Sequence, residues 1–515
     1  MSKSPSPTSH SNTFVKFLQL ILPVLTLASL VACGGGSSNR PNNGGGGGGN
    51  GAACAQPVPF STSPKSQGGL TNGAVPATFM DLHVGSSGLL NTVTVPYGGL
   101  RLWDTATGWA QIDTASGPIP DANWAILDGF VSAAQANNVD LLYDLARTPA
   151  WISSNPNDSS CAYSDSTEGG PGQCDPPSDL NSDGSGTDAA WIAWVTAVAT
   201  RYKGEIKFYE IWNEWNATLF WTGTPAQLVR LEQDARCVIE GPPAGLLCNP
   251  NSKTLPASPI DTSARIITPV PVGTASTLNA VQTNLATYFG TQVPLGTGYF
   301  GGQFADIIGF HGYVSSGMSG QCPIPENVIA VIDDMNTAIT AAPGESGKPW
   351  FDTEDGWSKA ADEGFLDQDR EAAFLARYEL LQWSMGVDRG YWYRWDSTQG
   401  YQGALWTSGT GTIEAVGAWN EVSKWMVGAT LSAPCTVSPT GNVWTCGFTR
   451  SGGYSALAVW NASQDCLNGS CPTTVYTVPA GYTLYRDLAG TETSISGGTV
   501  PIGAKPILLE TATLP

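Results

Sequence analysis

Short apolar strands that alternate with amphipathic helices extend through most of this 515-residue sequence. Between residues 56 and 427 the pattern predicts eight such strands, which fit one closed (β/α)8 barrel with enlarged loops. The sequence therefore predicts an α/β fold built on a parallel barrel. The expected strands are residues 79–84, 99–103, 139–145, 206–211, 264–268, 305–310, 349–353 and 390–395.

Helix signals between these strands support the same interpretation. Asp188, Thr224 and Asp367 each precede a helical pattern and are residue types that cap helix N-termini. Pro225 fits a first helical turn, and Gly386 is typical of a helix end. The expected helices are residues 123–136, 189–203, 225–240, 326–341, 368–385 and 413–427.

Beyond Gly428 the pattern changes to short alternating strands separated by turns. Such alternation is typical of antiparallel sheets. We therefore expect residues 428–515 to form a small β-sandwich domain. Its expected strands are residues 444–448, 455–460, 474–478, 482–487 and 507–510.

The N-terminal part of the sequence carries export signals. Residues 1–33 form a signal segment in which lysines precede an apolar run that is too short to span a membrane. The run ends in LVAC, which resembles a bacterial lipobox and implies lipidation of Cys33; an ordinary cleaved signal is the alternative. Residues 34–55 are Gly-rich and predict a flexible tether. Because Gly34 follows the cysteine, we expect an exported lipoprotein of the outer membrane or cell surface, which contacts the membrane only through its lipid.

Ten of the eleven cysteines remain if Cys33 carries lipid. An even number in an exported chain predicts disulfides. Four pairs are local in the sequence, and the two cysteines left over would form a long bridge. The expected pairs are Cys161–Cys174, Cys237–Cys248, Cys435–Cys446, Cys466–Cys471 and Cys54–Cys322. With no CxxC motif and only three histidines, the sequence predicts no zinc site.

The formal net charge of −20 makes nucleic acid and anionic lipid poor partners. Only 13% of the residues are charged, whereas 10% are aromatic. This balance favours a large neutral ligand that is bound by stacking. One motif remains open: Asp179 to Gly184 matches the front half of a calcium loop, but Ala190 replaces the Glu expected at the twelfth position, so a polar turn is the alternative.

The stretch IKFYEIWNEWN, residues 206–216, carries the strongest chemical signal. It begins as a buried strand and then places Glu214 between tryptophans and asparagines, where a buried anion is costly unless it is paired or used. The residues WNE at this position resemble the acid/base signature of the clan A glycoside hydrolases, which are (β/α)8 barrels. The resemblance implies that Glu214 protonates the leaving oxygen and later takes a proton from water, which needs a raised pKa.

The mechanism of that clan also needs a second carboxylate. Glu354 ends the seventh expected strand, in KPWFDTEDGW. The strand ends of a parallel barrel open onto one face, so both carboxyl groups would face one sugar ring. At a separation of about 5–5.5 Å, Glu354 would be the nucleophile and hydrolysis would retain the anomeric configuration.

The resemblance assigns supporting residues as well. Asn213 would bind the sugar 2-hydroxyl, Tyr313 would hold the nucleophile, and His311 lies on the same lip. Arg101 would pair with the nucleophile and keep its pKa low. Trp395 would form the floor of the subsite. Candidate walls are Trp103, Asp104, Trp151, Trp215, Trp357 and Trp406.

Within the clan, LRLWD, RTPAW, YEIWNE and the trailing sandwich look most like glycoside hydrolase family thirty-nine, although Trp215 stands where Pro often follows the acid/base. This implies a cofactor-free retaining β-glycosidase whose partner is an oligo- or polysaccharide, such as a neutral xylan or glucan fragment. Two alternatives remain open: a glycan-binding protein that has lost catalysis, and a transglycosylase.

Overall fold

The computed structural model describes residues 73–164, 169–273, 280–293, 299–314, 324–357, 367–397, 404–466 and 469–514. The expected signal segment, the lipidated Cys33, the tether and the Cys54–Cys322 bridge lie outside the described residues. Across the described residues, none of the helices has the length and apolar character needed to cross a bilayer.

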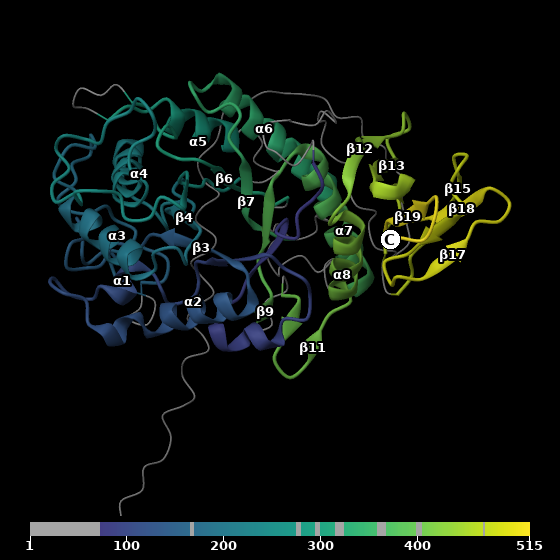
Figure 1. The fold of residues 1–515 in the computed structure, drawn as a ribbon, viewed down its shortest axis with the longest axis horizontal. Helices are drawn as coiled ribbons and strands as arrows, with labels where there is room; N and C mark the ends of the chain where they lie inside the picture. Colours follow the sequence, from purple (N-terminus) through teal and green to yellow (C-terminus); the bar gives the residue numbers. More distant parts are fainter. Residues whose placement is uncertain are drawn as a thin grey trace, which may run out of the picture. The chain divides into compact units, whose positions relative to one another are not determined.

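Eight parallel strands form the barrel that the sequence predicts, with helices around them (Figure 1). Their hydrogen-bonded order is β5-β4-β3-β2-β1-β8-β7-β6, and parallel bridges from Ile267 to Ile307 and from Val272 to His311 join the two ends. The strands are β1 (Met80–His83), β2 (Gly99–Leu102), β3 (Asp140–Leu145), β4 (Phe208–Ile211), β5 (Arg265–Ile267), β6 (Ile308–His311), β7 (Trp350–Asp355) and β8 (Arg389–Trp392).

The barrel interior is filled by side chains. Leu142, Ile267, Phe351 and Tyr391 belong to one buried cluster and come from β3, β5, β7 and β8. Strands of this kind are buried on both faces, which explains their continuous apolar character. Because the interior is packed, a substrate has to bind at the ends of the strands.

The helices follow the expected pattern, with an additional helix α5 and a short helix α1. They are α1 (Trp109–Ile112), α2 (Ala125–Asn137), α3 (Ala189–Arg201), α4 (Pro225–Ile239), α5 (Ala280–Phe289), α6 (Val328–Ala341), α7 (Gln368–Met385) and α8 (Ala415–Met426). Short 3-10 turns include η3 (Ser87–Thr92) and η4 (Asp121–Trp124).

Two of the three predicted caps form. The Thr224 hydroxyl accepts from the backbone N–H of Gln227 at 3.2 Å, and the Asp367 carboxylate accepts from two backbone N–H groups at the start of α7. Asp188 does not cap α3 with its side chain, so that prediction is wrong. Its backbone is left-handed, with φ of 49°, and its carboxylate is buried.

The C-terminal region is antiparallel, as expected. It contains a six-stranded sheet, in the order β12-β13-β14-β19-β16-β17, and the two-stranded sheet β15-β18. Val459, Ile502 and Leu509 belong to one buried cluster that joins residues of both sheets. The strands are β12 (Thr430–Val437), β13 (Val443–Thr449), β14 (Ser455–Asn461), β15 (Thr474–Thr477), β16 (Leu484–Arg486), β17 (Glu492–Ser494), β18 (Thr499–Ile502) and β19 (Ile507–Glu510).

This region is joined to the barrel by specific contacts. Strand β12 packs against α7, where the backbone N–H of Cys435 donates to the Ser384 hydroxyl at 2.7 Å. The Trp460 indole donates to Glu326 at 2.8 Å, and Glu326 also accepts from Arg377 on α7.

Four disulfides are present among the described residues, and they are the four local pairs that the sequence predicts. Disulfides form and persist in oxidising compartments, which supports an exported protein. The first of them, Cys161–Cys174, closes a loop of the long insertion between β3 and α3.

Candidate active site

Glu214 and Glu354 meet at the carboxyl ends of the strands. Glu354 lies in β7, and Glu214 follows β4 by three residues. One carboxylate oxygen of each, together with a ring nitrogen of His311, lies within 4.8 Å of the others. Two carboxyl groups that are far apart in the sequence are thus brought to one point by opposite sides of the barrel.

Glu354 is held by two donors. The Tyr313 hydroxyl donates to Oε1 at 2.7 Å, and the Arg101 guanidinium donates to Oε2 at 2.9 Å. Burial raises the pKa of Glu354, and the charge of Glu214 adds to this, whereas His311, Arg101 and Tyr313 lower it. The expectation of a low pKa is therefore wrong, because burial outweighs the pairing with Arg101.

Glu214 contacts the His311 ring, whose Nδ1 lies 2.9 Å from Oε1. Burial lowers the pKa of His311 to about 4, so the imidazole is neutral near pH 7. A neutral imidazole can donate to a carboxylate or accept from a carboxylic acid through Nδ1, depending on its tautomer. His311 can therefore accommodate both protonation states of Glu214.

The backbone around Glu214 is unusual for a strand end. Trp212 and Glu214 both have left-handed backbones, with φ of 67° and 39°. Non-glycine residues rarely adopt this conformation, and it costs free energy that the surrounding structure must offset. This backbone explains why the regular strand β4 ends at Ile211.

Arg101 is the centre of a buried charge cluster beneath the two carboxylates. Its side chain is fully buried and donates to Glu354, to Glu210 at 2.9 Å, to Asp144 at 3.2 Å and to the Asn213 side-chain oxygen at 2.8 Å. Three carboxyl groups exceed the charge of one guanidinium. Burial, followed by the charge of Glu210, raises the pKa of Asp144 well above its usual value.

Trp103 and Asp104 lie on one side of this cluster, beyond β2. The Arg147 guanidinium lies over the Trp103 ring at 4.2 Å and pairs with Asp104 at 3.0 Å. The Tyr393 hydroxyl also donates to Asp104, at 2.7 Å. The Tyr163 hydroxyl lies 3.4 Å from the same carboxylate and donates to it.

Comparison with known proteins identifies the fold. No protein-family model and no curated protein matches the sequence. A family 39 glycoside hydrolase from the gut symbiont Bacteroides cellulosilyticus WH2 has a TM-score of 0.55 and 15% identity, over 84% of this chain and 81% of that one. A monomeric β-xylosidase from Caulobacter crescentus CB15 has a TM-score of 0.51 and 17% identity, over 85% and 97%. The family 39 enzyme from Xanthomonas axonopodis pv. citri has a TM-score of 0.51 and 16% identity, over 85% and 95%.

The chain has the fold of the family 39 glycoside hydrolases. The resemblance expected from the sequence is therefore confirmed at the level of the fold.

Three predicted aromatic residues do not present a ring to the site of this family 39-like barrel. Trp357 is buried and packs edge-on against Trp392 at 4.8 Å. Trp395 is also buried, and its indole donates to the Thr92 hydroxyl at 2.9 Å. Trp151 is 36% exposed but lines a different hollow, which is described below. The predictions of Trp357 as a wall and of Trp395 as the floor are wrong, because a tryptophan near a strand end can equally fill the core.

Two further predicted walls are mostly covered. Trp215 is only 8% exposed, and its ring lies 6.1 Å from that of Tyr288. Trp406 forms part of a small sheet, where its backbone N–H donates to the Trp395 carbonyl at 2.7 Å.

Sequence reasoning missed Asp144, Glu210, Arg147, Tyr163 and Tyr393. Glu210 belongs to the same motif as Glu214, and Asp144 follows three apolar or aromatic residues in β3. An acidic residue inside a buried strand is a signal for a buried partner, because an isolated anion is costly there. That signal was present in the sequence, but its partner Arg101 could be identified only from the structure.

Among the described residues, two groups of side chains are spaced closely enough to consider a metal ion. In the first group, Glu214 contacts His311, and both oxygens of Glu354 accept from Arg101 and Tyr313. In the other group, both cysteines form the Cys161–Cys174 disulfide. In the calcium-like stretch, the Asp183 carboxylate accepts from the backbone N–H of Ser185 at 2.8 Å, which is the polar-turn arrangement.

Proposed function

We propose that this protein is a retaining β-glycosidase that cleaves a neutral β-linked glycan. The observation that supports it most is the approach of the Glu214 and Glu354 oxygens to within 4.8 Å. Retaining glycosidases place their carboxyl groups about 5–5.5 Å apart, whereas inverting enzymes leave about 6.5–9.5 Å for a water molecule. The approach seen here fits the shorter separation.

In the first step, a Glu354 oxygen bonds to the anomeric carbon while the glycosidic bond breaks. Arg101 and Tyr313 each bind one oxygen of Glu354, which fixes the orientation of the carboxylate. Glu214 transfers its proton to the leaving oxygen. The products of this step are a glycosyl ester of Glu354 and an ionised Glu214.

In the second step, Glu214 takes a proton from water, and the resulting hydroxide oxygen bonds to the anomeric carbon and releases Glu354. The His311 ring, whose Nδ1 lies 2.9 Å from Glu214 Oε1, fixes the orientation of this carboxyl group. The Asn213 oxygen accepts from Arg101, so its amide group is the donor for the sugar 2-hydroxyl.

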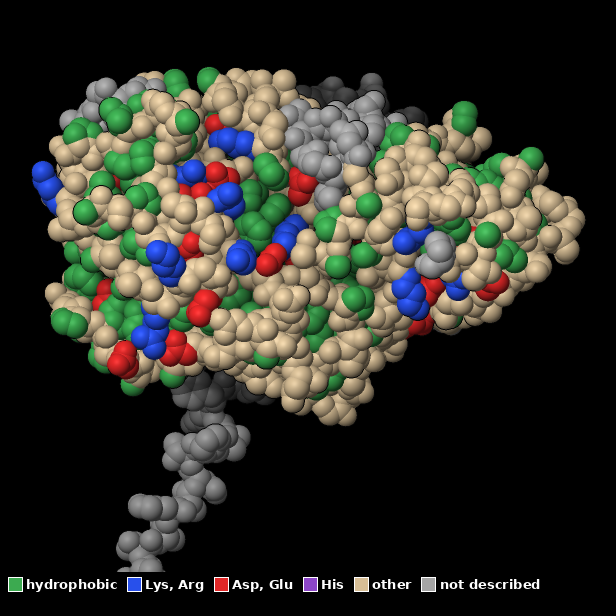
Figure 2. Space-filling model, in the orientation of Figure 1, with side chains coloured by type: hydrophobic (Ala, Val, Ile, Leu, Met, Phe, Trp, Pro, Cys, Tyr) green, Lys and Arg blue, Asp and Glu red, His purple; other side chains and the backbone are tan. Residues whose placement is uncertain are grey.

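The substrate class follows from the surroundings of the carboxylates. Apart from Asp104 and Arg147, which pair with each other, the side of the site described above is aromatic. Lys, Arg, Asp and Glu side chains lie scattered among broad uncharged areas on the face shown in Figure 2. We assign a neutral xylan- or glucan-type chain, a choice that agrees with the β-xylosidase among the structural relatives.

The N-terminal sequence extends the proposal to location. LVAC at residues 30–33 and the Gly-rich tether indicate a lipid anchor at Cys33 and a position at the outer membrane or cell surface. Mass spectrometry of the membrane fraction tests this, since lipidation adds acyl mass to Cys33 and Cys33→Ser should release the protein from the membrane.

The catalytic assignment is tested by Glu214→Gln and Glu354→Gln. Each should lower kcat on aryl β-glycosides by about 10³-fold or more, because each removes a general acid or the nucleophile. Far-UV and near-UV circular dichroism should stay unchanged. The control is Glu492→Gln, which changes an exposed residue of β17.

Labelling separates the alternatives. A 2-deoxy-2-fluoro-β-glycoside should leave a covalent adduct on Glu354, which peptide mass spectrometry locates. A glycan-binding protein without catalysis would give no adduct. A transglycosylase would give the adduct but form longer products at high acceptor concentration. Full turnover by the Glu354→Gln variant would refute the nucleophile assignment.

A further inference from the structure

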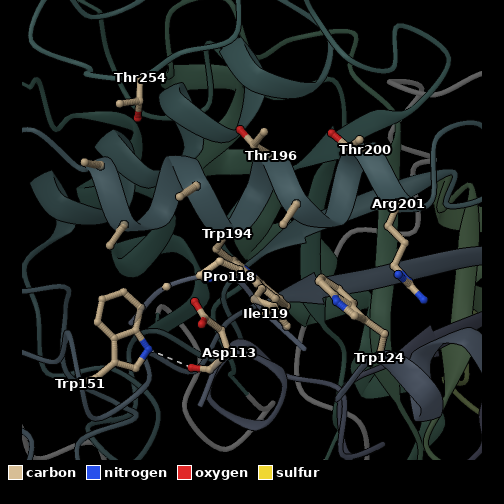
Figure 3. A pocket seen from close by; sticks show the side chains of 15 residues that line it. Asp113, Pro118, Ile119, Trp124, Trp151, Trp194, Thr196, Thr200, Arg201 and Thr254 are labelled. Carbon is tan, nitrogen blue, oxygen red and sulfur yellow. Dashed lines mark hydrogen bonds between the residues drawn. The ribbon is translucent and has the colours of Figure 1, made fainter. Parts of the chain in front are cut away.

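A hollow of about 880 Å³ lies across helix α3, on the outer layer of the barrel (Figure 3). It shares no lining residue with the carboxylate cluster described above. Much of the α3 surface that lines it consists of small residues, including Ala193 and Ala197, although Trp194 and Arg201 also border it. The opposite side is formed by the loop from Asp113 to Ile119 and by Trp151.

Three polar atoms on residues that line this hollow are buried and have no hydrogen-bond partner among the described residues. They are Asp113 Oδ1, Trp194 Nε1 and Thr196 Oγ1. Asp113 is only 7% exposed, and Trp194 only 1%. Buried polar atoms are nearly always paired, and leaving one unpaired costs about 1–3 kcal/mol. Two acceptors and two donors, counting the hydroxyl of Thr196 as both, thus remain unpaired on residues that line the hollow.

Trp151 supplies a flat surface beside these polar atoms. It is one of few large apolar side chains that are exposed among the described residues, at 36%. Its indole N–H donates to the Asp113 carbonyl oxygen at 2.9 Å, drawn as a dashed line in Figure 3, and this fixes the ring orientation. A rigid, partly exposed indole next to hydrogen-bonding groups suits a ligand with an apolar face and a hydroxyl-bearing edge.

The charge of the hollow excludes an ionic ligand. Its charged lining residues are Asp113 and Arg201. Arg201 is already paired with Asp128 at 2.8 Å, so it is not available to an anion, and the net charge of −20 repels anions as well. From this combination we infer that the hollow is a second carbohydrate site, which binds a neutral glycan chain by stacking on Trp151 and hydrogen bonding to Asp113.

The site would bind several sugar units. Helix α3 borders the hollow from Ala189 to Arg201, a length of about 18 Å at a rise of ~1.5 Å per residue. A polysaccharide bound here stays near the barrel while another part of the same chain meets the carboxylates, which raises its effective concentration there. The binding itself does not require catalysis, so it can be tested apart from the proposed function.

Native gel electrophoresis in gels that contain dissolved arabinoxylan or mixed-linkage β-glucan tests this inference. The full chain with Glu354→Gln serves as the parent, because it leaves the polysaccharide intact. At least one of the two polysaccharides should retard the parent. Trp151→Ala and Asp113→Asn should each weaken the association at least threefold, whereas Trp151→Phe, which keeps a ring, should retain most of it.

Ala193→Arg provides a second test, because it places a large side chain in the hollow and leaves the Trp151 residue itself unchanged. Ala193 is exposed on α3, and Ala136→Arg on the exposed face of α2 is the matched control. The first change should weaken retardation at least threefold, and the control should leave it unchanged. In the chain with Glu354 intact, neither change should alter the hydrolysis of an aryl β-glycoside, which reports on the carboxylates alone.

The inference is overturned if neither polysaccharide retards the parent, or if Trp151→Ala and Ala193→Arg are both retarded like the parent. The inference is also overturned if Ala193→Arg is retarded like the parent but no longer self-associates in the gel. That result would assign the hollow to contact with a second copy of the chain. If the chain with Glu354 intact failed to hydrolyse an aryl β-glycoside, the glycosidase proposal would be contradicted. The gel retardation would still test whether the hollow binds polysaccharide, because binding does not require catalysis.

Discussion

At the scale of single residues, Tyr313 is the contact that a substitution can test most directly. Burial raises the pKa of Glu354, and the Tyr313 hydroxyl opposes this by donating to Oε1 at 2.7 Å. Tyr313→Phe removes that donor, so the pKa of Glu354 should rise further. Glu354 attacks as an anion, so activity falls as the pH drops through this pKa. The acidic limb of the kcat/KM profile should therefore move to higher pH, by about one unit for a hydrogen bond worth ~1 kcal/mol.

The measurement is the pH dependence of kcat/KM on an aryl β-glycoside. Tyr476→Phe in β15 is the control, because it makes the same change in the antiparallel region. A merely structural role for Tyr313 would lower activity at every pH without moving the limb. An acidic limb that stays in place or moves to lower pH would contradict the prediction.

Carboxylates at strand ends, together with the resemblance to the clan A glycoside hydrolases, predicted part of this site. Glu214, Glu354, His311, Tyr313, Arg101 and Asn213 converge because each is placed by a strand end or by the loop that follows it. Strand order in the sequence, read with the layout that the resemblance implies, is enough to place such residues. Trp357 and Trp151 show where this reasoning fails. Trp357 is buried against Trp392, and Trp151 lines the hollow beside helix α3. Only tertiary packing decides whether a tryptophan near a strand end lines the site, fills the core or faces another surface.

At the scale of elements, the sequence predicted helix ends correctly where residues at the end itself determine them. Helix α7 begins and ends at the expected residues, because the Asp367 cap and the left-handed Gly386 are both local. Helix α5 was missed although Val281, Leu285 and Tyr288 have helical spacing and are buried. Asp188 has the composition of a cap, but its burial and its left-handed backbone, which no sequence pattern revealed, prevent capping.

The start of α4 gives a prediction at this scale. Thr224 and Gln227 satisfy one another's backbone N–H groups in a capping box. Thr224→Ala should lower the free energy of unfolding by about 1 kcal/mol, the usual value of an N-cap, and leave kcat unchanged. Denaturant unfolding measures this. Thr337→Ala, at an exposed position within α6, should be near neutral; an equal loss in both variants would show that capping is not the cause.

At the scale of the whole molecule, the distribution of charge matters more than any one pair. The chain carries a net charge of −20, and several of its carboxyl groups are buried. Burial raises the pKa of Asp81 and Glu232 to about 7, and that of Asp355 and Glu371 to about 8. In the unfolded chain, carboxyl groups of this kind titrate at about 3.9 to 4.3.

These values fix the sign of the pH dependence of stability. Between about pH 4 and pH 8 the folded state keeps protons that the unfolded state releases, so the free energy of unfolding falls as the pH rises. The melting temperature should therefore be several degrees higher at pH 5 than at pH 8 at constant ionic strength.

Glu371→Gln should raise the melting temperature at pH 8 and change it little at pH 5, because Gln needs no proton to remain buried. Glu492→Gln, on the exposed strand β17, is the control and should leave the difference between the melting temperatures at pH 5 and pH 8 unchanged. If the protein melted higher at pH 8 than at pH 5, pairing with the buried arginines would have to outweigh burial in these carboxyl groups, and their proposed protonation would be wrong.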